Sequence, residues 1–368
     1  MEKVQPAKPP TPRDVLGVPA VPPARASAAG NRWRDRVLRL HRRMAPPPLQ
    51  VLESLFGILD HRVLVALCEA GVPEALTRPM PVAELARRTG TDADALERLV
   101  RFGATRGWLR IDRRGAVRPT AVTAFLHRDH PGGWRAWVDF AGGDDVVGAV
   151  RRLSASGGAD PFAAANGLPF FEWMTTHGER GAAFDGAMEA GARMHGLVLA
   201  KALPWTSPGS VCDVGGGTGA LLATLLAHEP GLTGTVLDLP SVVEHAVEHD
   251  RLTAVAGDAF ESVPAGFDTY LLVNVVHDWG DEDAVRILGT VARAATAQAR
   301  VVVVEAEATA RPVAGVAVAT DVLMAALTPG GRERTAEEVR ALGERAGLRL
   351  VSRAPLASGD VAWTFRTG

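Results

Sequence analysis

Cysteine, lysine and long apolar runs are all scarce in this 368-residue sequence. The two cysteines, Cys68 and Cys212, stand in apolar surroundings, which excludes a disulfide framework and a cysteine-ligated metal cluster. No run of about 18 apolar residues occurs, and no apolar segment with a cleavage site follows Met1. The sequence therefore predicts a reduced, cytoplasmic protein with no membrane span and no secretory signal.

Lysine accounts for only three of the 40 basic residues, Lys3, Lys8 and Lys201. We attribute the many arginines to the codon bias of a GC-rich genome and not to phosphate binding. The net charge of −2 argues against nucleic acid as the general partner. With 47% hydrophobic residues, the chain is long enough to build two hydrophobic cores.

The most informative segment is 211–219, where a short apolar strand runs into a glycine-rich loop that opens a helix. Gly215, Gly217 and Gly219 let the backbone approach a ligand closely, and free N–H groups of the helix point into the same space. Asp238 ends the next predicted strand, where a carboxylate can accept both hydroxyls of a ribose. This order predicts a nucleotide-like ligand.

Two cofactor classes fit such a loop. The pattern Gly215-x-Gly217-x-x-Ala220 satisfies the relaxed dinucleotide fingerprint, so an NAD-dependent oxidoreductase is one alternative. In the order Asp213-x-Gly215-x-Gly217-x-Gly219, however, the third glycine follows the second by two residues. That spacing favours a ligand without phosphates, because the dinucleotide fingerprint binds a pyrophosphate.

Five sequence blocks carry a family resemblance. In chain order they are Val-Cys-Asp-Val-Gly-Gly-Gly-Thr-Gly (211–219), Val-Leu-Asp-Leu-Pro (236–240), Gly-Asp-Ala-Phe (257–260), Val-His-Asp-Trp-Gly-Asp-Glu (276–282) and Gly-Gly-Arg-Glu-Arg-Thr (330–335). With these blocks the chain resembles the class I S-adenosylmethionine-dependent O-methyltransferases of plant phenolics and bacterial polyketides. The resemblance implies an α/β fold, with a Rossmann-like seven-stranded methyltransferase domain preceded by a mostly helical winged-helix dimerisation domain.

The resemblance also implies the ligands: S-adenosylmethionine, leaving as S-adenosylhomocysteine, no metal, and a small aromatic or polyketide-like acceptor of secondary metabolism, bound by a homodimer. Gly215 and Gly217 would border the methionine moiety. Asp238 would bind the ribose, and Asp258 with Phe260 would flank the adenine. Four further residues complete the predicted cofactor site: Asp213, Leu239, Gly257 and, against the methionine carboxylate, Arg180.

His277 is the candidate general base. It follows the apolar run 270–276, which places it at the carboxyl end of a central strand, and Glu305 follows the run 301–304 in the same way. Methyl transfer to a phenol removes a proton of pKa about 10, and imidazole, with an ordinary pKa of about 6.5, is mostly neutral at pH 7 and can take it. By the resemblance, Glu305 and Glu333 hold the far ring nitrogen.

The front of the chain divides into two predicted parts. Residues 1–30 are rich in proline and alanine and are expected to be disordered. Residues 31–133 show the order helix, turn, helix and β wing, which raises a second alternative, a ligand-responsive transcriptional regulator. Three acidic residues argue against a DNA-binding regulator, because they lie in the segment that would face the DNA phosphates and would be repelled by them: Asp92, Asp94 and Glu97. We therefore expect a dimerisation domain.

Residues 134–200 are expected to form a helical linker that contributes to the acceptor pocket, and residues 201–368 the S-adenosylmethionine-binding catalytic domain. The predicted pocket for a flat, hydrophobic acceptor is lined by Trp173, Met188, Asn274, Met324 and Leu327. The identity of the acceptor, and oxygen against nitrogen as its reactive atom, stay open. So does a third alternative, because some members of the family use the bound sulfonium for hydroxylation or pericyclic chemistry.

Overall fold

The structure is a computed structural model that describes residues 11–154, 159–310 and 316–368. It divides into two compact units. The smaller contains residues 36–147 and 177–190, and the larger contains residues up to 35, 148–176 and 191–368. The expected linker is therefore shared between the two units and does not form a part of its own.

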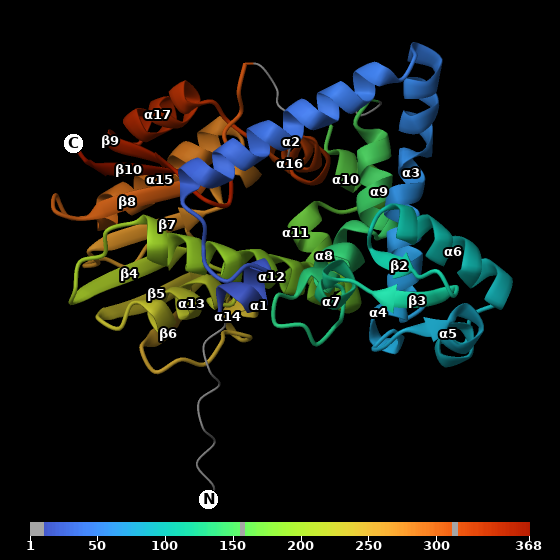
Figure 1. Ribbon diagram of the computed structural model, residues 1–368. Coiled ribbons are helices and arrows are strands. Elements are labelled where there is room, and N and C mark those ends of the chain that lie inside the picture. The colour runs from blue at the N-terminus through green and yellow to red at the C-terminus, as the bar shows by residue number, and fades with distance from the viewer. Residues whose placement is uncertain (1–10, 155–158, 311–315) are drawn as a thin grey trace, which may run out of the picture. The chain divides into compact units, whose positions relative to one another are not determined.

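The smaller unit folds as the predicted winged helix (Figure 1). Its elements are α3 (Pro47–Glu69), α4 (Val72–Ala75), β1 (Met80–Pro81), α5 (Val82–Thr89), α6 (Ala93–Thr105), β2 (Leu109–Ile111), β3 (Ala116–Pro119), α7 (Ala121–Phe125) and α8 (Trp134–Ala141). The wing is an antiparallel sheet in the order β1-β3-β2. Asp92 caps the start of α6, where its carboxylate accepts the N–H of Ala95 at 2.9 Å, so this acid has a structural role.

The apolar face of α3 is only partly buried. Val63 lies in the core of the smaller unit, whereas Leu55 and Phe56 are 66% and 54% exposed. The preceding helix, α2 (Ala24–Met44), also exposes its apolar side chains. Residues 36–59 thus present an apolar surface that the described part of the chain does not cover.

The larger unit is built on a seven-stranded sheet in the order β6-β5-β4-β7-β8-β10-β9. The strands are β4 (Gly209–Val214), β5 (Leu232–Asp238), β6 (Leu252–Ala256), β7 (Thr269–Val273), β8 (Arg300–Glu305), β9 (Leu348–Pro355) and β10 (Val361–Thr367). Strands β4 to β8 are parallel, and β10 is antiparallel to both of its neighbours. The predicted Rossmann-like seven-stranded sheet is confirmed.

Helices cover both faces of this sheet (Figure 1). Apart from the N-terminal helices α1 and α2, the helices of the larger unit and those that both units share are α9 (Asp144–Arg152), α10 (Pro161–Asn166), α11 (Phe170–Thr176), α12 (Gly178–Ala202), α13 (Ala220–His228), α14 (Pro240–Val243), the 3-10 turn η1 (Val276–Asp278), α15 (Asp281–Ala294), α16 (Val316–Leu327) and α17 (Ala336–Arg345). Along β8, Val301 and Val303 pack with α15 and α17, while Val302 and Val304 pack with α12 and α13. This alternation places one apolar cluster on each face.

The prediction of disorder for residues 1–30 is wrong for two helical segments, while residues 1–10 lie outside the described residues. Helix α1 (Pro12–Leu16) buries Val15 and begins with a capping box, and α2 begins at Ala24. A proline at the first turn of α1 is compatible with helix, because the N–H it lacks would have no partner there.

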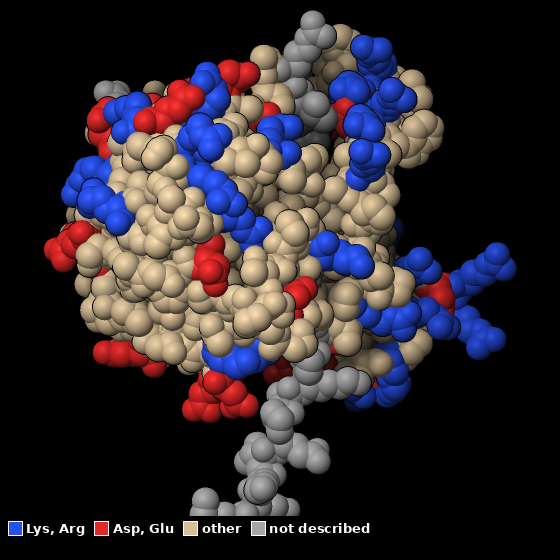
Figure 2. Space-filling model, turned by 90° about the vertical axis from the view of Figure 1, so that its left-hand side faces the viewer, with Lys and Arg blue, Asp and Glu red and all other residues tan. Residues whose placement is uncertain are grey.

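Both cysteines are free and buried, as the sequence indicates. Among the described residues, no helix combines the length and the apolar character needed to cross a membrane. On the face drawn in Figure 2, acidic and basic side chains are interspersed with uncharged residues, in keeping with the small net charge of −2.

Candidate active site

The glycine-rich loop joins β4 to α13 at the carboxyl edge of the sheet. Gly215, Gly217 and Gly219 adopt positive φ angles of 68°, 61° and 81°, which residues with a side chain rarely adopt. A Cβ atom on Gly217 would meet no atom within 4 Å, so the space beside the loop is open. The loop therefore has room for a ligand against its backbone.

Asp238 ends β5 beside this loop. Its Oδ2 accepts the N–H of Gly217 and its Oδ1 accepts the N–H of Leu239, both at 2.8 Å. Burial raises the pKa of Asp238, and these two N–H groups partly offset the rise. Each oxygen keeps a further lone pair, so the carboxylate can hold the loop and accept a ligand hydroxyl together.

Asp213 lies buried in β4, just ahead of the loop. Its Oδ2 has no hydrogen-bond partner among the described residues. Burial and the charge of Asp238 raise the pKa of Asp213 to about 7. A cationic group of a ligand would stabilise the ionised form of this buried carboxylate, which lacks a partner in the described part of the chain.

The third predicted cofactor segment follows β6. Gly257 donates its N–H to the carbonyl oxygen of Asp238 at 2.9 Å, and the Asp258 carboxylate accepts the N–H of Phe260 at 2.8 Å. The Phe260 ring packs edge-on against Trp279, with centroids 4.7 Å apart. This segment therefore continues the edge of the sheet that begins at the glycine loop.

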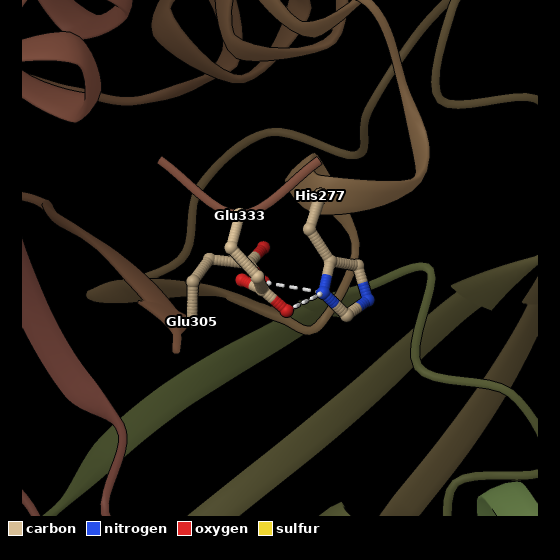
Figure 3. Close-up of side chains that lie close together, drawn as sticks. All are labelled: His277, Glu305 and Glu333. Atoms are coloured by element: carbon tan, nitrogen blue, oxygen red, sulfur yellow. Dashed lines mark hydrogen bonds and ion pairs between the residues drawn. The ribbon is translucent and has the colours of Figure 1, made fainter. Parts of the chain in front are cut away.

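His277, Glu305 and Glu333 lie together, although they come from three different segments (Figure 3). Nδ1 of His277 is 3.1 Å from Oε1 of Glu333 and 3.4 Å from Oε2 of Glu305. Glu305 is itself fixed, because its Oε1 accepts the N–H groups of Val275 and Val276 at 3.1 and 2.8 Å. Both carboxylates thus face the same nitrogen and leave Nε2 turned away from them.

The charges around His277 change its expected protonation. Burial by itself lowers the pKa of His277, but the carboxylates of Glu305, Asp278 and Glu333 outweigh it and raise the pKa to about 10. Burial raises the pKa of Glu305 to about 7. The three carboxylates therefore favour the protonated ring in the unliganded site, whereas the sequence predicted a mostly neutral His277 at pH 7.

Asp278 faces the other ring nitrogen, with Oδ1 at 3.7 Å from Nε2 of His277. It does not cap the following helix, because α15 begins at Asp281 with Gly280 as its N-cap. Burial raises the pKa of Asp278 to about 6. One carboxylate therefore lies on the side of His277 where an acceptor would approach.

The cluster also has the donor set of a cation site. Ligand atoms of His277, Glu305 and Glu333 lie within 4.8 Å of one another, and nitrogen and carboxylate oxygen both bind divalent metals. The metal-free reaction expected from the sequence therefore stays a prediction.

Two further residues next to the cluster, Asp321 and Arg334, were not predicted from the sequence. Asp321 accepts the N–H of Glu333 at 2.9 Å, and the buried side chain of Arg334 contacts the main chain next to His277. The only sequence signal for Arg334 is its place in the block 330–335, and one arginine does not stand out in an arginine-rich chain.

Arg180 and Met188 belong to the smaller unit. The Arg180 guanidinium donates to the carbonyl oxygens of Asp139 and Phe140, both at 2.7 Å, and to the Asp145 carboxylate at 3.1 Å. These contacts would have to be given up before Arg180 could bind a methionine carboxylate. Its predicted role therefore stays a prediction.

The predicted acceptor residues differ in exposure. Asn274 is exposed directly after β7, with a φ of 54° that is uncommon outside glycine, and Met188 is 37% exposed. Met324 and Leu327, on α16, are only 8% and 2% exposed. The Trp173 ring packs against that of Phe162, with centroids 5.6 Å apart.

Comparison with known proteins shows the family of this chain. A family model of the O-methyltransferase domain matches residues 148–349, and a model of the O-methyltransferase dimerisation domain matches residues 52–129. A mitomycin biosynthesis 6-O-methyltransferase of Streptomyces lavendulae is 34% identical over 335 residues, which cover 84% of this chain and 92% of that protein. Aclacinomycin 10-hydroxylase RdmB of Streptomyces purpurascens is 32% identical over 302 residues, 77% of this chain and 79% of that protein.

A similar solved structure is that of NcsB1, an O-methyltransferase from neocarzinostatin biosynthesis, in complex with S-adenosylmethionine and 2-hydroxy-5-methyl naphthoic acid. Its TM-score is 0.69 at 30% identity, and the alignment covers 84% of this chain and 96% of that one. The fold, the order of the two domain models and the full-length relatives agree. The chain belongs to the family of S-adenosylmethionine-dependent O-methyltransferases.

Proposed function

We propose that this enzyme methylates a hydroxyl oxygen of a small aromatic or polyketide-like molecule in natural product biosynthesis, with His277 as the general base. The observation that carries the proposal is that Glu333 and Glu305 hold Nδ1 and leave Nε2 turned away from them (Figure 3). The naphthoic acid bound to NcsB1 and the mitomycin named for the Streptomyces relative support the acceptor class.

In the proposed reaction, an oxygen–carbon bond to the methyl group forms as the sulfur–carbon bond breaks, and the hydroxyl proton passes to Nε2 of His277. Glu333 and Glu305 stabilise the imidazolium that results. Because the surrounding carboxylates favour the protonated ring, His277 must be deprotonated before it can act as the base. Because two cations repel each other, the pKa of His277 falls when a sulfonium is bound nearby.

The proposed cofactor site is the edge formed by the glycine loop, Asp238 and the segment 257–260. The open space beside Gly217 and the spare lone pairs of Asp238 fit an adenosyl ligand. Asp213 would stabilise a cationic group, and Leu239 and Phe260 would supply apolar surface. The role of Arg180 at the methionine carboxylate stays a prediction from the sequence.

Calorimetric titration with S-adenosylhomocysteine tests this site without knowledge of the acceptor. We expect micromolar binding to the wild type and none to Asp238→Ala. Glu344→Ala is the control, because Glu344 pairs with Arg340 on the surface of α17 and not at the glycine loop. Binding of NAD instead would overturn the proposal in favour of a dehydrogenase, and binding of neither ligand would favour the regulator.

The role of His277 as the base can be tested only by measuring methyl transfer to an acceptor. We expect His277→Ala to abolish methyl transfer while its affinity for S-adenosylhomocysteine stays nearly unchanged. Full activity after treatment with a chelator is expected for the metal-free reaction. Retained turnover in His277→Ala would overturn the assignment of the base, and loss of activity that Mg²⁺ or Zn²⁺ restores would overturn the metal-free reaction.

We propose that Trp173, Asn274, Met324 and Leu327, all of the larger unit, line the acceptor pocket, and the role of Met188 stays a prediction from the sequence. A homodimer is proposed to form through the apolar surface of residues 36–59, since the dimerisation model begins at residue 52 and most of this surface is exposed. The two free thiols are in keeping with a reduced, cytoplasmic location.

Similarity to RdmB, a hydroxylase, favours one second candidate function, in which the bound cofactor supports hydroxylation. The two functions differ in the fate of the methyl group. With labelled S-adenosylmethionine and a converted acceptor, label in the product indicates methylation. A product that gains oxygen and no label indicates hydroxylation.

A further inference from the structure

We propose that Arg334 is a positioning residue for the proposed reaction, and that its guanidinium holds the main chain on both sides of His277 against the segment that carries Glu333. This inference rests on the proposed function of His277. Arg334 acts through His277 and is not itself a catalytic residue.

The turn that carries His277 is weakly held by its own hydrogen bonds. In η1, the N–H of Asp278 lies 3.3 Å from the carbonyl oxygen of Val275, and the N–H of Trp279 lies 3.4 Å from that of Val276. A single 3-10 turn with such long bonds does not by itself fix a side chain. Its geometry must come from contacts with other segments.

Arg334 supplies two of these contacts. Its Nη1 donates to the carbonyl oxygen of Val276 at 2.9 Å, and its Nη2 donates to that of Trp279 at 2.6 Å. The two carbonyls lie one residue before His277 and two residues after it. The fixed fork of one guanidinium therefore sets the path of the backbone through His277.

The charge of Arg334 is buried but paired. The side chain is only 2% exposed, and Asp281 accepts from Nε at 3.0 Å and from Nη2 at 2.9 Å. Asp281 is the first residue of α15, where a carboxylate also meets the positive end of the helix dipole. A lysine has the charge but not the fork, so it could not make all of these contacts together.

The residues next to Arg334 complete the contact with the turn. Arg332 donates its N–H to the carbonyl oxygen of His277 at 2.8 Å, and Glu333 donates its N–H to Asp321 at 2.9 Å. A Cβ atom on Gly331 would lie 3.0 Å from the carbonyl oxygen of His277, so the two segments pack closely. The distance between the His277 ring and the Glu333 carboxylate thus depends on the main-chain contacts that Arg334 makes.

Replacing Arg334 with methionine should loosen the turn and move the ring away from Glu333. We expect kcat to fall about 100-fold, the loss that a displacement of about 1 Å can cause, with little change in the affinity for S-adenosylhomocysteine. Arg334→Lys should restore part of the rate. A residue with a merely structural role would lower thermal stability without moving the ionisation of His277.

The decisive measurement is an NMR titration of the His277 ring in the wild type, Arg334→Met and Arg334→Lys, which needs no acceptor. The charged groups that face this ring are Glu305, Glu333 and Asp278. Loss of the Arg334 charge would by itself raise the pKa of His277, so a fall reports that the ring has moved away from Glu333 and Glu305. We expect a fall of at least one unit in Arg334→Met and a smaller fall in Arg334→Lys.

Arg345→Met is the control, because Arg345 of α17 also pairs with an acidic residue at the start of α15, Glu282, but is exposed and does not contact the His277 turn. An unchanged pKa of His277 in folded Arg334→Met would overturn the inference. If that variant does not fold, an unchanged pKa and rate in Arg334→Lys would do so. The proposed function fails separately, through retained turnover in His277→Ala.

Discussion

Nδ1 of His277 lies 3.1 Å from Oε1 of Glu333, a residue 56 positions further along the chain. An ionised carboxylate can only accept a hydrogen bond, so the neutral ring carries its proton on Nδ1 and its lone pair on Nε2. Whenever the ring is neutral, this contact therefore selects the tautomer that a general base needs. The same contact also favours the imidazolium, which links the pH dependence of the enzyme to its acidic residues.

Glu333→Gln tests this link by removing one charge while keeping the shape of the side chain. Since Glu305, Asp278 and Glu333 raise the pKa of His277 to about 10, we expect the acidic limb of the kcat/KM profile to move to lower pH in the variant. The plateau should fall, by up to about 100-fold, because the imidazolium formed in the reaction is less stabilised. Rates measured from pH 6 to pH 10 check this, and a limb at the wild-type pH would contradict it.

Asp213→Asn should make the unliganded protein more stable at high pH. The unfolded chain loses the Asp213 proton near its ordinary pKa of 3.8, whereas the folded chain keeps it up to about 7. Stability therefore falls as the pH rises through this range, by at most about 4 kcal/mol, since one pKa unit corresponds to about 1.36 kcal/mol.

The asparagine amide would also lack a partner, so we expect a gain of only about 1 to 2 kcal/mol at pH 8 and none at pH 4. Thermal unfolding at the two pH values measures it. Affinity for S-adenosylhomocysteine should fall in the same variant. Equal gains at both pH values would show that the charge of Asp213 is not the cause.

Phe56→Glu should convert a dimer to monomers, because Phe56 is 54% exposed on α3 and a charge there cannot be buried against a second copy. Sedimentation of the wild type and the variant measures the change. Val351→Glu is the control, since Val351 is 49% exposed on β9, outside the dimerisation domain. A dimer that survives Phe56→Glu would place the interface elsewhere.

The sheet edge and the approximate place of the site could be predicted because their signals are local. Glycines, Asp238, His277 and Glu305 each follow a short apolar run, and parallel strands bring such positions to one edge. The position of Glu333 followed only from the family resemblance, because no strand precedes it.

Other features depend on tertiary contacts that no local pattern encodes. The protonation of His277 follows from three carboxylates that gather around one ring, so its ordinary pKa misled the prediction. Arg334 has a role only because its segment packs on the His277 turn. Helix α1 forms in a proline-rich region because Val15 is buried, and composition alone favours disorder there.

Substitutions at two neighbouring glycines, Gly216 and Gly217, distinguish the structural role of the loop from its proposed role in ligand binding. A Cβ atom on Gly216 would lie 2.6 Å from Cγ of Asp213 and 2.8 Å from Cγ2 of Val236, so Gly216→Ala should destabilise the fold by about 1 to 3 kcal/mol. In Gly217→Ala the new Cβ atom would lie in open space, so the only cost to the stability of the fold is the positive φ of 61°, about 1 to 2 kcal/mol.

The added methyl group of Gly217→Ala, however, occupies the side of the loop where the cofactor is proposed to bind. We therefore expect Gly217→Ala to lose at least about tenfold in affinity for S-adenosylhomocysteine at 25 °C, a change of about 1.4 kcal/mol, although the variant stays folded. Gly216→Ala should show its larger effect in thermal unfolding. Wild-type affinity in Gly217→Ala would mean that the open side of the loop is not where the cofactor lies, because no ligand can share that space with a methyl group.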